Sequence, residues 1–375
     1  MKLTKKKLLV LCDWYFPAVK AGGPVRSVAA IVTALKNDFE ISVLTSDRDV
    51  GDDHSFPGIE TDVWLSKDGY RLQYLSPDAN KKTIKAEVGK DYDKIYLNSL
   101  FSKFFTILAL RSLKTAAKSK VVIAPRGMLG AGALGLKALK KQVFLSLAKA
   151  IGLYNKVTWH ASTSIEATEI RKVFPAAKVT ALENLSVCKP AKYVESSKQE
   201  GRLKMVFVSR ISGKKNLLFL LQLLSEIGEE KISLDIYGPL EDAEYWEKCL
   251  VLLDANSEAQ YKGVLEPNNS HSVLSAYDLF VLPTLNENFG HVILEALNSS
   301  LPLLLSNNTP WLNLKAQNIG ADIPLEEKEE WKESLLQFAE MSDSAYEPMR
   351  QSAWNFGQKK LDQDYLIKEY VNLFS

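Results

Sequence analysis

Short apolar runs alternate along the chain with longer stretches of helical periodicity, and this alternation restricts the possible folds more than any other feature. In the first half, the runs rich in Val, Ile and Leu occupy 6–13, 39–46, 93–99, 119–125, 156–162 and 178–184. Near-continuous apolar strands separated by helices indicate a parallel sheet with helices on both faces. This half is therefore predicted to be a doubly wound α/β domain.

The alternation stops once and then restarts. Residues 187–202, VCKPAKYVESSKQEGR, are polar and have neither strand nor helix periodicity, as expected of an interdomain linker. Further strand-like runs follow at 202–210, 232–238, 259–264, 278–283 and 301–306. We therefore predict two Rossmann-like parallel-sheet domains, 1–190 and 191–355, that face each other across a cleft.

A last helical stretch, about 343–374 with a break at Gly357, belongs to neither alternation. We expect its end, 356–375, to form a helix that crosses back to the first domain.

Composition excludes several classes of protein. The chain has 375 residues, of which 46% are hydrophobic and 25% charged, as in a soluble globular protein of about two domains. Its cysteines, Cys12, Cys188 and Cys249, have no C-x-x-C spacing, so neither a disulfide scaffold nor a zinc site is predicted. The apolar run after the lysines at 5–7 is too short for a secretion signal, and no uncharged run approaches the ~20 residues of a membrane-spanning helix. We expect a cytoplasmic protein.

Open parallel sheets bind ligands at the carboxyl ends of their strands, so residues just after the strands are informative. Gly22, Gly23 and Pro24 follow the first strand and open an amphipathic helical pattern. Backbone N–H groups at a helix start, beside Arg26, make an anion site. A plain turn before a helix is the alternative.

Basic residues follow the first strand of the second half. Arg210 comes directly after this strand, and Lys214 and Lys215 lie just before the next helical run. Arg binds phosphate bidentately and Lys acts as a point charge, so this cluster suits a diphosphate. The alternative is a solvated turn.

Two acids, Glu287 and Glu295, flank a glycine eight residues apart in NENFGHVILEALNSS. Glu287 is predicted to lie in a loop, Glu295 one turn inside a helix, and Gly290 to let the backbone approach a ligand. A carboxylate at each end of an anion site matches a sugar nucleotide, with hexose and ribose hydroxyls at the two ends and a diphosphate between them. Alternatively, Glu295 faces solvent and Glu287 is an ordinary loop residue.

At this point the chain resembles the retaining family 4 glycosyltransferases of GT-B fold, whose E-x7-E pattern appears here as ENFGHVILE. The resemblance continues through YFPAVKAGGPVRSVAAIV, VSRISGKKN, LDIYGPLED and YKGVLEP. It implies metal-independent and cofactor-free transfer of a hexose from a nucleotide-diphosphate sugar, with retention of configuration. The acceptor would be a saccharide or lipid-linked saccharide in surface polysaccharide biosynthesis.

The resemblance also assigns roles to residues. Glu287 would hold a hydroxyl of the donor sugar, and Arg210 and Lys215 would neutralise the diphosphate; these three are the predicted catalytic residues. Glu295 would bind the ribose hydroxyls. The other predicted donor contacts are Gly22 and Gly23 at the phosphates, Gly263 and Val264 near the base, and Asn288, Phe289, Gly290 and His291 in the acidic motif. Asn286, Thr309 and Trp311 are candidates for selecting the sugar.

The chain departs from the family pattern at one place. Many members carry a histidine at the carboxyl end of a middle strand of the first domain, where this sequence has VVIAPRGMLGAG with Arg126. His160 follows the next strand. Arg126 and His160 are therefore the candidates for the acceptor side, and a half-buried strand residue is the alternative for His160.

Two other motifs are rejected. GAGALG at 130–135 fits the dinucleotide fingerprint, but that fingerprint needs an acid about 20 residues further on. No Asp or Glu occurs from Lys94 to Ile165, which disfavours an NAD-dependent enzyme. The D-x-D triplets that begin at Asp47, Asp91 and Asp362 are interpreted as solvated acids.

The same acid-free region is strongly basic although the whole chain has a net charge of +2. Its basic residues are Lys94, Lys103, Arg111, Lys114, Lys118, Lys120, Arg126, Lys137, Lys140, Lys141, Lys149 and Lys156. A basic amphipathic surface attracts anionic lipid headgroups, so we predict peripheral association with the inner face of a membrane. A solvated face is the alternative, and no stacking motif or recognition helix supports nucleic-acid binding.

Two further functional classes stay open. One is a non-catalytic module that binds a sugar nucleotide, and the other is a different GT-B enzyme such as an epimerase.

Overall fold

The chain folds into two compact units, Met1–Val187 with Gln363–Ser375, and Cys188–Asp362. The sequence placed the corresponding limits at 190 and 355. The structure is a computed structural model and describes residues 5–130, 138–228, 231–266 and 269–375.

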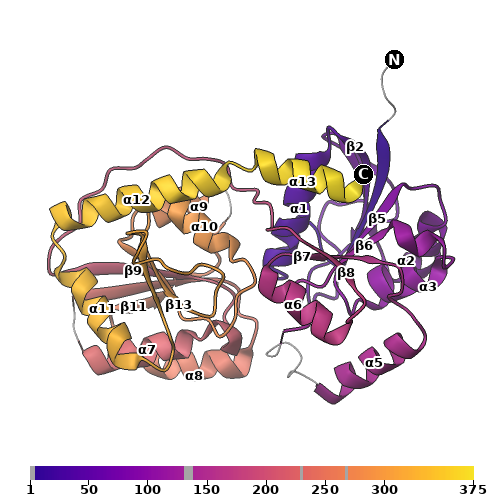
Figure 1. The fold of residues 1–375 in the computed structure, drawn as a ribbon. Helices are drawn as coiled ribbons and strands as arrows, with labels where there is room; N and C mark the ends of the chain where they lie inside the picture. Colours follow the sequence, from indigo (N-terminus) through magenta and orange to yellow (C-terminus); the bar gives the residue numbers. More distant parts are fainter. Residues whose placement is uncertain (1–4, 131–137, 229–230, 267–268) are drawn as a thin grey trace. The chain divides into compact units, whose positions relative to one another are not determined.

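The first unit is built around an eight-stranded sheet with the order β3-β4-β2-β1-β5-β6-β7-β8 (Figure 1). The strands are β1 (Lys6–Cys12), β2 (Phe39–Ser46), β3 (Leu65–Lys67), β4 (Tyr70–Leu75), β5 (Lys94–Asn98), β6 (Val121–Ala124), β7 (Thr158–Ala161) and β8 (Lys178–Ala181). All pairings are parallel except that of β3 with β4. The strand order reverses at β1, whose neighbours are β2 and β5, so the topological switch point lies beside the carboxyl end of β1.

Helices cover both faces of this sheet, and β1 is buried on both. Leu9 and Leu11 of β1 belong to one apolar cluster, while Leu8 and Val10 belong to the other. The helical elements are α1 (Gly23–Leu35), α2 (Pro77–Val88), the π-helical turn η1 (Lys103–Leu108), α3 (Ala109–Ser112), the 3-10 turn η2 (Ala117–Lys120), α5 (Ala138–Ala150), α6 (Ser164–Val173) and α13 (Asp364–Phe374). Within the described part of the chain, no helix has both the length and the apolar character needed to cross a bilayer.

The second unit has a six-stranded parallel sheet with the order β11-β10-β9-β12-β13-β14. Its strands are β9 (Leu203–Val208), β10 (Ile232–Tyr237), β11 (Ala259–Tyr261), β12 (Leu279–Leu282), β13 (Leu303–Ser306) and β14 (Gly320–Ile323). The helical elements are η3 (Gly213–Lys215), α7 (Leu217–Ile227), α8 (Ala243–Asp254), α9 (Ser270–Leu274), α10 (His291–Asn298), α11 (Lys328–Glu340) and α12 (Asp343–Leu361). Here the strand order reverses at β9, between β10 and β12.

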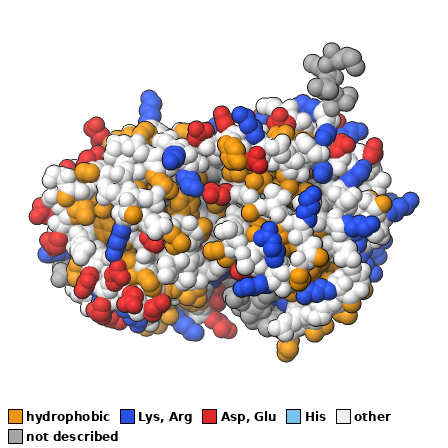
Figure 2. Space-filling model, viewed as in Figure 1, with side chains coloured by type: hydrophobic (Ala, Val, Ile, Leu, Met, Phe, Trp, Pro, Cys, Tyr) orange, Lys and Arg blue, Asp and Glu red, His pale blue; other side chains and the backbone are white. Residues whose placement is uncertain are grey.

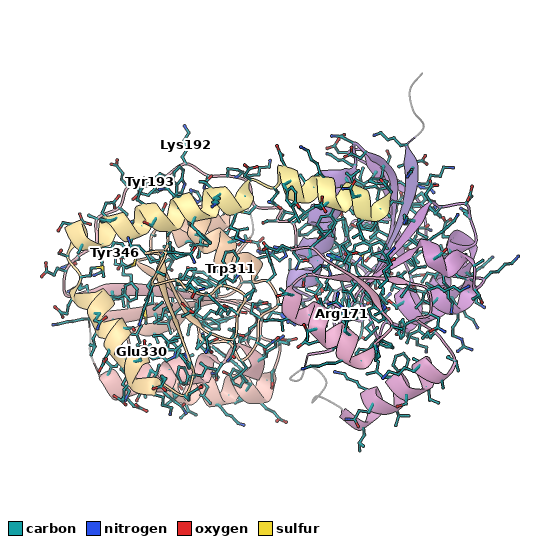
Figure 3. The ribbon with its side chains drawn as sticks, in the orientation of Figure 1. Arg171, Lys192, Tyr193, Trp311, Glu330 and Tyr346 are labelled. Carbon is teal, nitrogen blue, oxygen red and sulfur yellow. The ribbon has the colours of Figure 1, made fainter. Side chains whose placement is uncertain are left out.

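The segment predicted to be an interdomain linker is packed along the second unit. The guanidinium of Arg350 in α12 donates hydrogen bonds to the carbonyl oxygens of Val194 (3.0 Å) and Ser196 (3.1 Å). The ring of Tyr193 packs edge-on against that of Trp354, which is also in α12, with the ring centroids 5.7 Å apart. Figure 3 labels Tyr193 beside this helix. After Val187 the chain is therefore held in place by α12.

The expected helix break at Gly357 is wrong. Helix α12 continues through Gly357 and ends at Leu361, and α13 begins at Asp364. A Cβ at Gly357 would lie 3.0 Å from the backbone of Leu297 and Asn298 in α10. The glycine therefore serves close packing of two helices. Helix α13 belongs to the first unit, where Tyr370 is part of an apolar cluster.

Candidate functional site

A lysine and a glutamate from two different loops meet at the carboxyl edge of the second sheet. Lys215 ends η3, just after β9, and Glu287 lies in the loop between β12 and α10. The Lys215 ammonium forms an ion pair with Oε2 of Glu287, and the two side chains are 9% and 16% exposed. The backbone N–H of Glu287 donates to the carbonyl of Asn308 (2.9 Å), which fixes the loop.

The Glu287 carboxylate is kept ionised by its partners. Burial would raise its pKa, but the charge and hydrogen bond of Lys215, the charge of Lys214 and the backbone N–H of Asn288 outweigh burial, so the pKa lies below its usual value. The Asn288 N–H donates to Oε1 at 3.0 Å. One carboxylate oxygen therefore faces the lysine, and the other is held by the backbone.

The sequence did not reveal the polar contacts that join these two loops. The carbonyl oxygen of Lys214 accepts from the N–H of Leu285 (2.9 Å) and from the hydroxyl of Thr284 (3.1 Å). The hydroxyl of Ser306, at the end of β13, donates to the carbonyl of Thr284 at 2.5 Å. Thr284 and Ser306 are fully buried. In the sequence, the only sign that Thr284 and Ser306 belong to the site was their position at the ends of apolar strands.

Gly290 links the loop to α10 in a conformation that suits glycine. Its φ is +77°. A Cβ there would lie 2.7 Å from Cδ1 of Ile293 and 3.1 Å from Cγ of Glu287. One turn further, Glu295 is only 9% exposed. The alternative in which Glu295 is an ordinary solvent-facing helix residue is therefore wrong.

Aromatic packing shapes the middle of the acidic motif. The ring of Phe289 lies 4.8 Å from that of His291 and 6.0 Å from that of Trp311, measured between centroids. The indole N–H of Trp311 donates to the carbonyl of Phe289. All three side chains are buried, and Figure 3 labels Trp311 in the second unit. Trp311, a candidate for selecting among sugars, supports this loop through its contacts with Phe289.

Arg210 is not directed at the same acid as Lys215. Its guanidinium pairs with Glu241 at 2.5 Å, in the loop that follows β10. Both side chains are partly exposed. The two predicted phosphate-binding cations are thus each paired with a carboxylate, one buried and one near the surface.

The loop after β11 is fixed to the loop after β10. The carbonyl of Gly263 accepts from the N–H of Gly238 at 2.8 Å, and Gly263 has a φ of +83°. A Cβ at Gly238 would lie 1.7 Å from the carbonyl oxygen of Ser209, so no other residue fits there. The side chain of Val264 is exposed. It therefore offers an apolar surface beside a rigid turn.

In the first unit, Gly22 and Gly23 stand at the start of α1, and Gly22 has a φ of +69°. The loop before them is held by Asp49, whose carboxylate accepts from the N–H groups of Val19 (2.7 Å) and Lys20 (2.9 Å).

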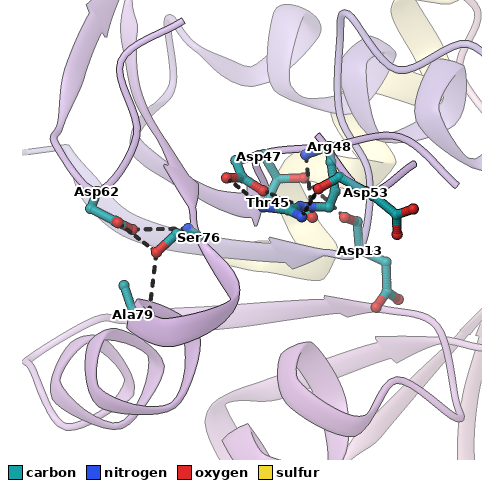
Figure 4. Close-up of polar contacts among 9 residues, drawn as sticks. Asp13, Thr45, Asp47, Arg48, Asp53, Asp62, Ser76 and Ala79 are labelled. Atoms are coloured by element: carbon teal, nitrogen blue, oxygen red, sulfur yellow. Dashed lines mark hydrogen bonds and ion pairs between the residues drawn. The ribbon is translucent and has the colours of Figure 1, made fainter. Parts of the chain in front are cut away.

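The acids of the first D-x-D triplet, Asp47 and Asp49, were expected to be solvated. They are buried. Asp49 holds the glycine loop, and Asp47 forms an ion pair with Arg48 at 2.8 Å. Arg48 also donates to the carbonyl of Asp53 at 2.5 Å (Figure 4). This triplet therefore organises the loop after β2.

Arg126 lies at the centre of a polar cluster after β6, with a φ of +56°. Its guanidinium donates to the hydroxyl of Tyr96 and to Oδ1 of Asn98, both at 2.9 Å, and also to Asn184. Asn98 ends β5 and is 5% exposed. Among the described residues, its Nδ2 has no hydrogen-bond partner. The cluster therefore contains a buried donor that a ligand oxygen would satisfy.

Asp13 is a site candidate that the sequence analysis missed. It directly follows β1 at the topological switch point, and the parallel register of Cys12 with Asn98 places it next to Ser99. The hydroxyl of Ser102 donates to its carboxylate at 2.6 Å. Burial raises the pKa of Asp13 to about 6 although hydrogen bonds from Ser102 and Ser99 oppose the shift. Figure 4 shows Asp13 beside the loop that carries Arg48.

His160 lies in the core of the first unit. It is fully buried; its Nδ1 contacts the hydroxyl of Tyr96 at 2.7 Å, and its Nε2 lies 3.1 Å from both the carbonyl of Leu182 and the hydroxyl of Tyr370. Burial, with the nearby charge of Arg126, lowers its pKa to about 3. We correct the prediction: His160 is a neutral core residue that joins β7 to α13.

Comparison with protein families finds a match for the second unit. Residues 189–354 match the family model described as glycosyl transferases group 1. The second unit therefore resembles the domain that this family model describes, and the matched residues make up less than half of the chain. No curated protein matches the chain.

Solved glycosyltransferases share the fold of the whole chain. Sucrose-phosphate synthase from Thermosynechococcus elongatus has a TM-score of 0.71 at 15% identity, with 99% of this chain and 98% of that chain covered. WaaG, a glycosyltransferase involved in lipopolysaccharide biosynthesis, has a TM-score of 0.66 at 14% identity, with 98% and 99% covered. Anabaena HepE, solved with UDP and glucose, has a TM-score of 0.70 at 14% identity, with 98% and 99% covered. The predicted GT-B fold is confirmed.

Within the second unit, the structure brings together Lys215, Glu287 and Gly290, and buries Glu295 one turn along α10. It does not bring Arg210 to Glu287. A fixed carboxylate next to a buried ammonium, ahead of a helix N-terminus, can accept hydroxyl hydrogens and bind negative charge in adjoining positions.

Proposed function

We propose that this protein transfers a hexose from a nucleoside-diphosphate sugar to a saccharide or lipid-linked saccharide, with retention of the anomeric configuration and without a metal. Surface polysaccharide biosynthesis is the setting that the proposal favours. WaaG acts in lipopolysaccharide biosynthesis, and HepE was solved with UDP-glucose as well as with UDP and glucose.

The observation that carries the proposal is the contact of Lys215 with Glu287. A buried ammonium costs free energy unless an anion accompanies it, and a carboxylate with fixed oxygens is a hydroxyl acceptor. In our mechanism the β-phosphate of the donor binds beside Lys215, while Glu287 accepts a hydrogen bond from a hydroxyl of the hexose. Lys215 then contacts both the sugar-binding acid and the leaving group.

Charge development explains why no metal is proposed. When the bond between the anomeric carbon and the phosphate oxygen breaks, negative charge grows on the diphosphate. Lys215, Arg210 and the N–H groups at the start of α10 would stabilise that charge. Arg210 has to leave Glu241 to do so, and this exposed ion pair is weak enough to be exchanged.

Glu295 and the open turn at Gly263 would bind the nucleoside. The buried Glu295 carboxylate suits the two ribose hydroxyls, and the exposed Val264 suits one face of a base. In the first unit, we propose that Asp13, Asn98 and Arg126 bind hydroxyls of the acceptor, because they combine a carboxylate with an unsatisfied amide donor.

Hydrolysis of the donor tests the proposal. The purified protein is incubated with diphosphate hexoses of uridine, guanosine, adenosine and thymidine, and the released sugar is followed by proton NMR. Water replaces the acceptor, so one of these donors should be hydrolysed to the nucleoside diphosphate and the free hexose. The hexose should first appear with the anomeric configuration that it had in the donor. Glu287→Gln should lower the rate about 100-fold. Release of the opposite anomer first would reject retention.

The binding module is the second candidate, because both cations are already paired with carboxylates. A nucleoside diphosphate that binds without any hydrolysis or transfer would favour it. EDTA provides the matching control for the metal: the hydrolysis rate should not change.

A further inference from the structure

Helix α5 carries an apolar stripe that faces solvent. Leu139, Val143 and Leu147 are 78%, 58% and 60% exposed, and Ile151, in the turn that follows, is 67% exposed. They recur every fourth residue, and an α-helix turns by about 100° per residue, so neighbours in the stripe are offset by only about 40°. Exposed apolar residues are ordinary when scattered, but a continuous row on one helix indicates a binding surface.

The opposite face of α5 already has its partners. Leu145 and Ala148 are buried in an apolar cluster of the first unit, and the ring of Phe144 packs edge-on against Phe101 at 5.6 Å between centroids. The apolar stripe is thus additional to the surface that attaches the helix to its own unit.

Basic side chains flank the stripe. Lys140 is exposed on α5 next to Leu139, and Lys141 lies 5.7 Å from the ring of Phe101. Lys103 in η1 lies 5.2 Å from the ring of Phe104. Figure 2 shows hydrophobic and basic side chains side by side at the lower edge of the unit that contains α5. Lysines beside an apolar row place positive charge where the row would meet a surface.

The sequence around α5 contributes no acid of its own to balance this charge. The sequence has no Asp or Glu from Lys94 to Ile165. The next acid, Glu166, is buried and accepts hydrogen bonds from the N–H of Gly127 and from Ser162.

The structure also narrows the basic region that the sequence suggested. Lys118 donates to the carbonyls of Gly152 and Leu153 after α5, Lys120 pairs with Asp91 at 3.4 Å, and Arg126 belongs to the polar cluster of β5 and β6. Lys137 lies outside the described residues. Lys118, Lys120 and Arg126 are therefore held by contacts within their own unit.

We propose that α5 lies in the interface of an anionic lipid bilayer, with Leu139, Val143, Leu147 and Ile151 among the upper acyl chains and Lys140 at the headgroups. Charge complementarity selects this occupant over a second copy of the chain, because two such faces would bring lysines together. Membrane binding rests on the proposed function in one respect only, which is its biological role: the first unit would meet a lipid-linked acceptor at the bilayer.

Vesicle flotation tests the inference without any sugar transfer. The full chain is mixed with vesicles of phosphatidylcholine alone or with 30% phosphatidylglycerol added, about the anionic content that gives a strong surface potential. Binding is expected to the anionic vesicles, and to weaken when salt is raised from 0.1 to 0.5 M. Equal binding to both vesicles, or none, would overturn the inference.

Two variants separate the apolar from the charged contribution. The double change Leu139→Ser with Leu147→Ser should reduce binding at least tenfold, because it removes apolar side chains from the interface. Lys140→Glu should reduce it at least fivefold, about the contribution of one lysine at an anionic surface.

Helix α8 offers a matched control in the second unit, since Val251 is 70% exposed there and Lys248 is exposed nearby. Val251→Ser with Lys248→Glu should leave flotation unchanged. Equal losses in the control and the α5 variants would contradict the assignment.

Light scattering after size exclusion tests the competing occupant. If the wild type is a dimer and the Leu139→Ser, Leu147→Ser variant is a monomer, the stripe binds a second copy of the chain and the membrane assignment is wrong. Donor hydrolysis measured on the same variants separates this inference from the proposed function, because the α5 changes should leave hydrolysis in solution intact.

Discussion

Two carboxyl groups, Asp13 and Glu287, have opposite pKa shifts although burial raises both. The difference lies in their partners. Glu287 has the Lys215 ammonium beside it, whereas Asp13 is held by neutral hydroxyls of Ser102 and Ser99. A cation lowers a carboxyl pKa more than a neutral donor does, so the two acids titrate in different ranges.

The pKa of Asp13 predicts a pH-dependent stability. It is raised from 3.8 to about 6, so the folded chain holds this proton more tightly than the unfolded chain. The stabilisation is complete below pH 3.8 and is lost as pH rises through about 6. Asp13→Asn should therefore increase the free energy of unfolding by roughly 2–3 kcal/mol at pH 7.5 relative to its effect at pH 4. Urea unfolding at both pH values measures this, and an equal effect at both would contradict the shift.

The ion pair of Arg210 with Glu241 predicts a gain of affinity. If Arg210 must leave Glu241 to bind a diphosphate, Glu241→Gln should tighten binding of UDP or GDP by two- to fivefold, about the strength of an exposed ion pair. Isothermal titration measures it. Weaker binding in the variant would show that Glu241 itself takes part in the site.

At the scale of elements, the loop from β12 to α10 depends on one glycine. Gly290→Ala would place a Cβ 2.7 Å from Ile293 in addition to the left-handed backbone. Gly228, which ends α7 with a φ of +64°, has nothing within 4 Å of such a Cβ. Gly228→Ala should therefore cost about 1–2 kcal/mol for the backbone alone, and Gly290→Ala at least about 1 kcal/mol more. Urea unfolding of the two variants gives the difference, and equal losses would refute the steric argument.

The elements that the sequence could predict are those with strong periodicity. Strands β1 and β2, the apolar strands at both sheet centres and helices α1, α7 and α10 lie where the patterns placed them. Strands β3, β4 and β14 were missed. β3 has three residues and lies at a sheet edge, β4 includes the polar residues Arg71 and Gln73, and β14 includes a glycine and Asp322, so none forms a continuous apolar run.

The candidate site was predictable where a motif carried it. The E-x7-E pattern singled out Glu287 and Glu295, and the basic residues after β9 singled out Lys215. Asp13 and Asn98 belong to no motif, and they come together only because β1 and β5 are parallel neighbours. His160 misled because a residue after a strand was taken as accessible, whereas α13, distant in sequence, covers it with Tyr370.

At the scale of the whole molecule, each unit has its own sheet, its own switch point and its own polar cluster at a carboxyl edge. The second unit carries the family match and the acids of the motif, while the first carries Asp13, Arg126 and the apolar stripe of α5. This division predicts that substitutions in the second unit alter nucleotide binding. Substitutions in α5 should alter membrane binding and leave nucleotide binding unchanged.

The most direct test of the central claim is a thermal-shift panel of nucleoside diphosphates and their sugar conjugates on the wild type, Glu295→Ala and Glu247→Ala. Glu247, an exposed acid on α8, is the control. We expect one nucleoside diphosphate to raise the melting temperature of the wild type and of Glu247→Ala by several degrees, and to raise that of Glu295→Ala much less. A shift of equal size in all three proteins, or no shift with any nucleotide, would contradict the assignment of the Glu287–Glu295 loop as the donor site.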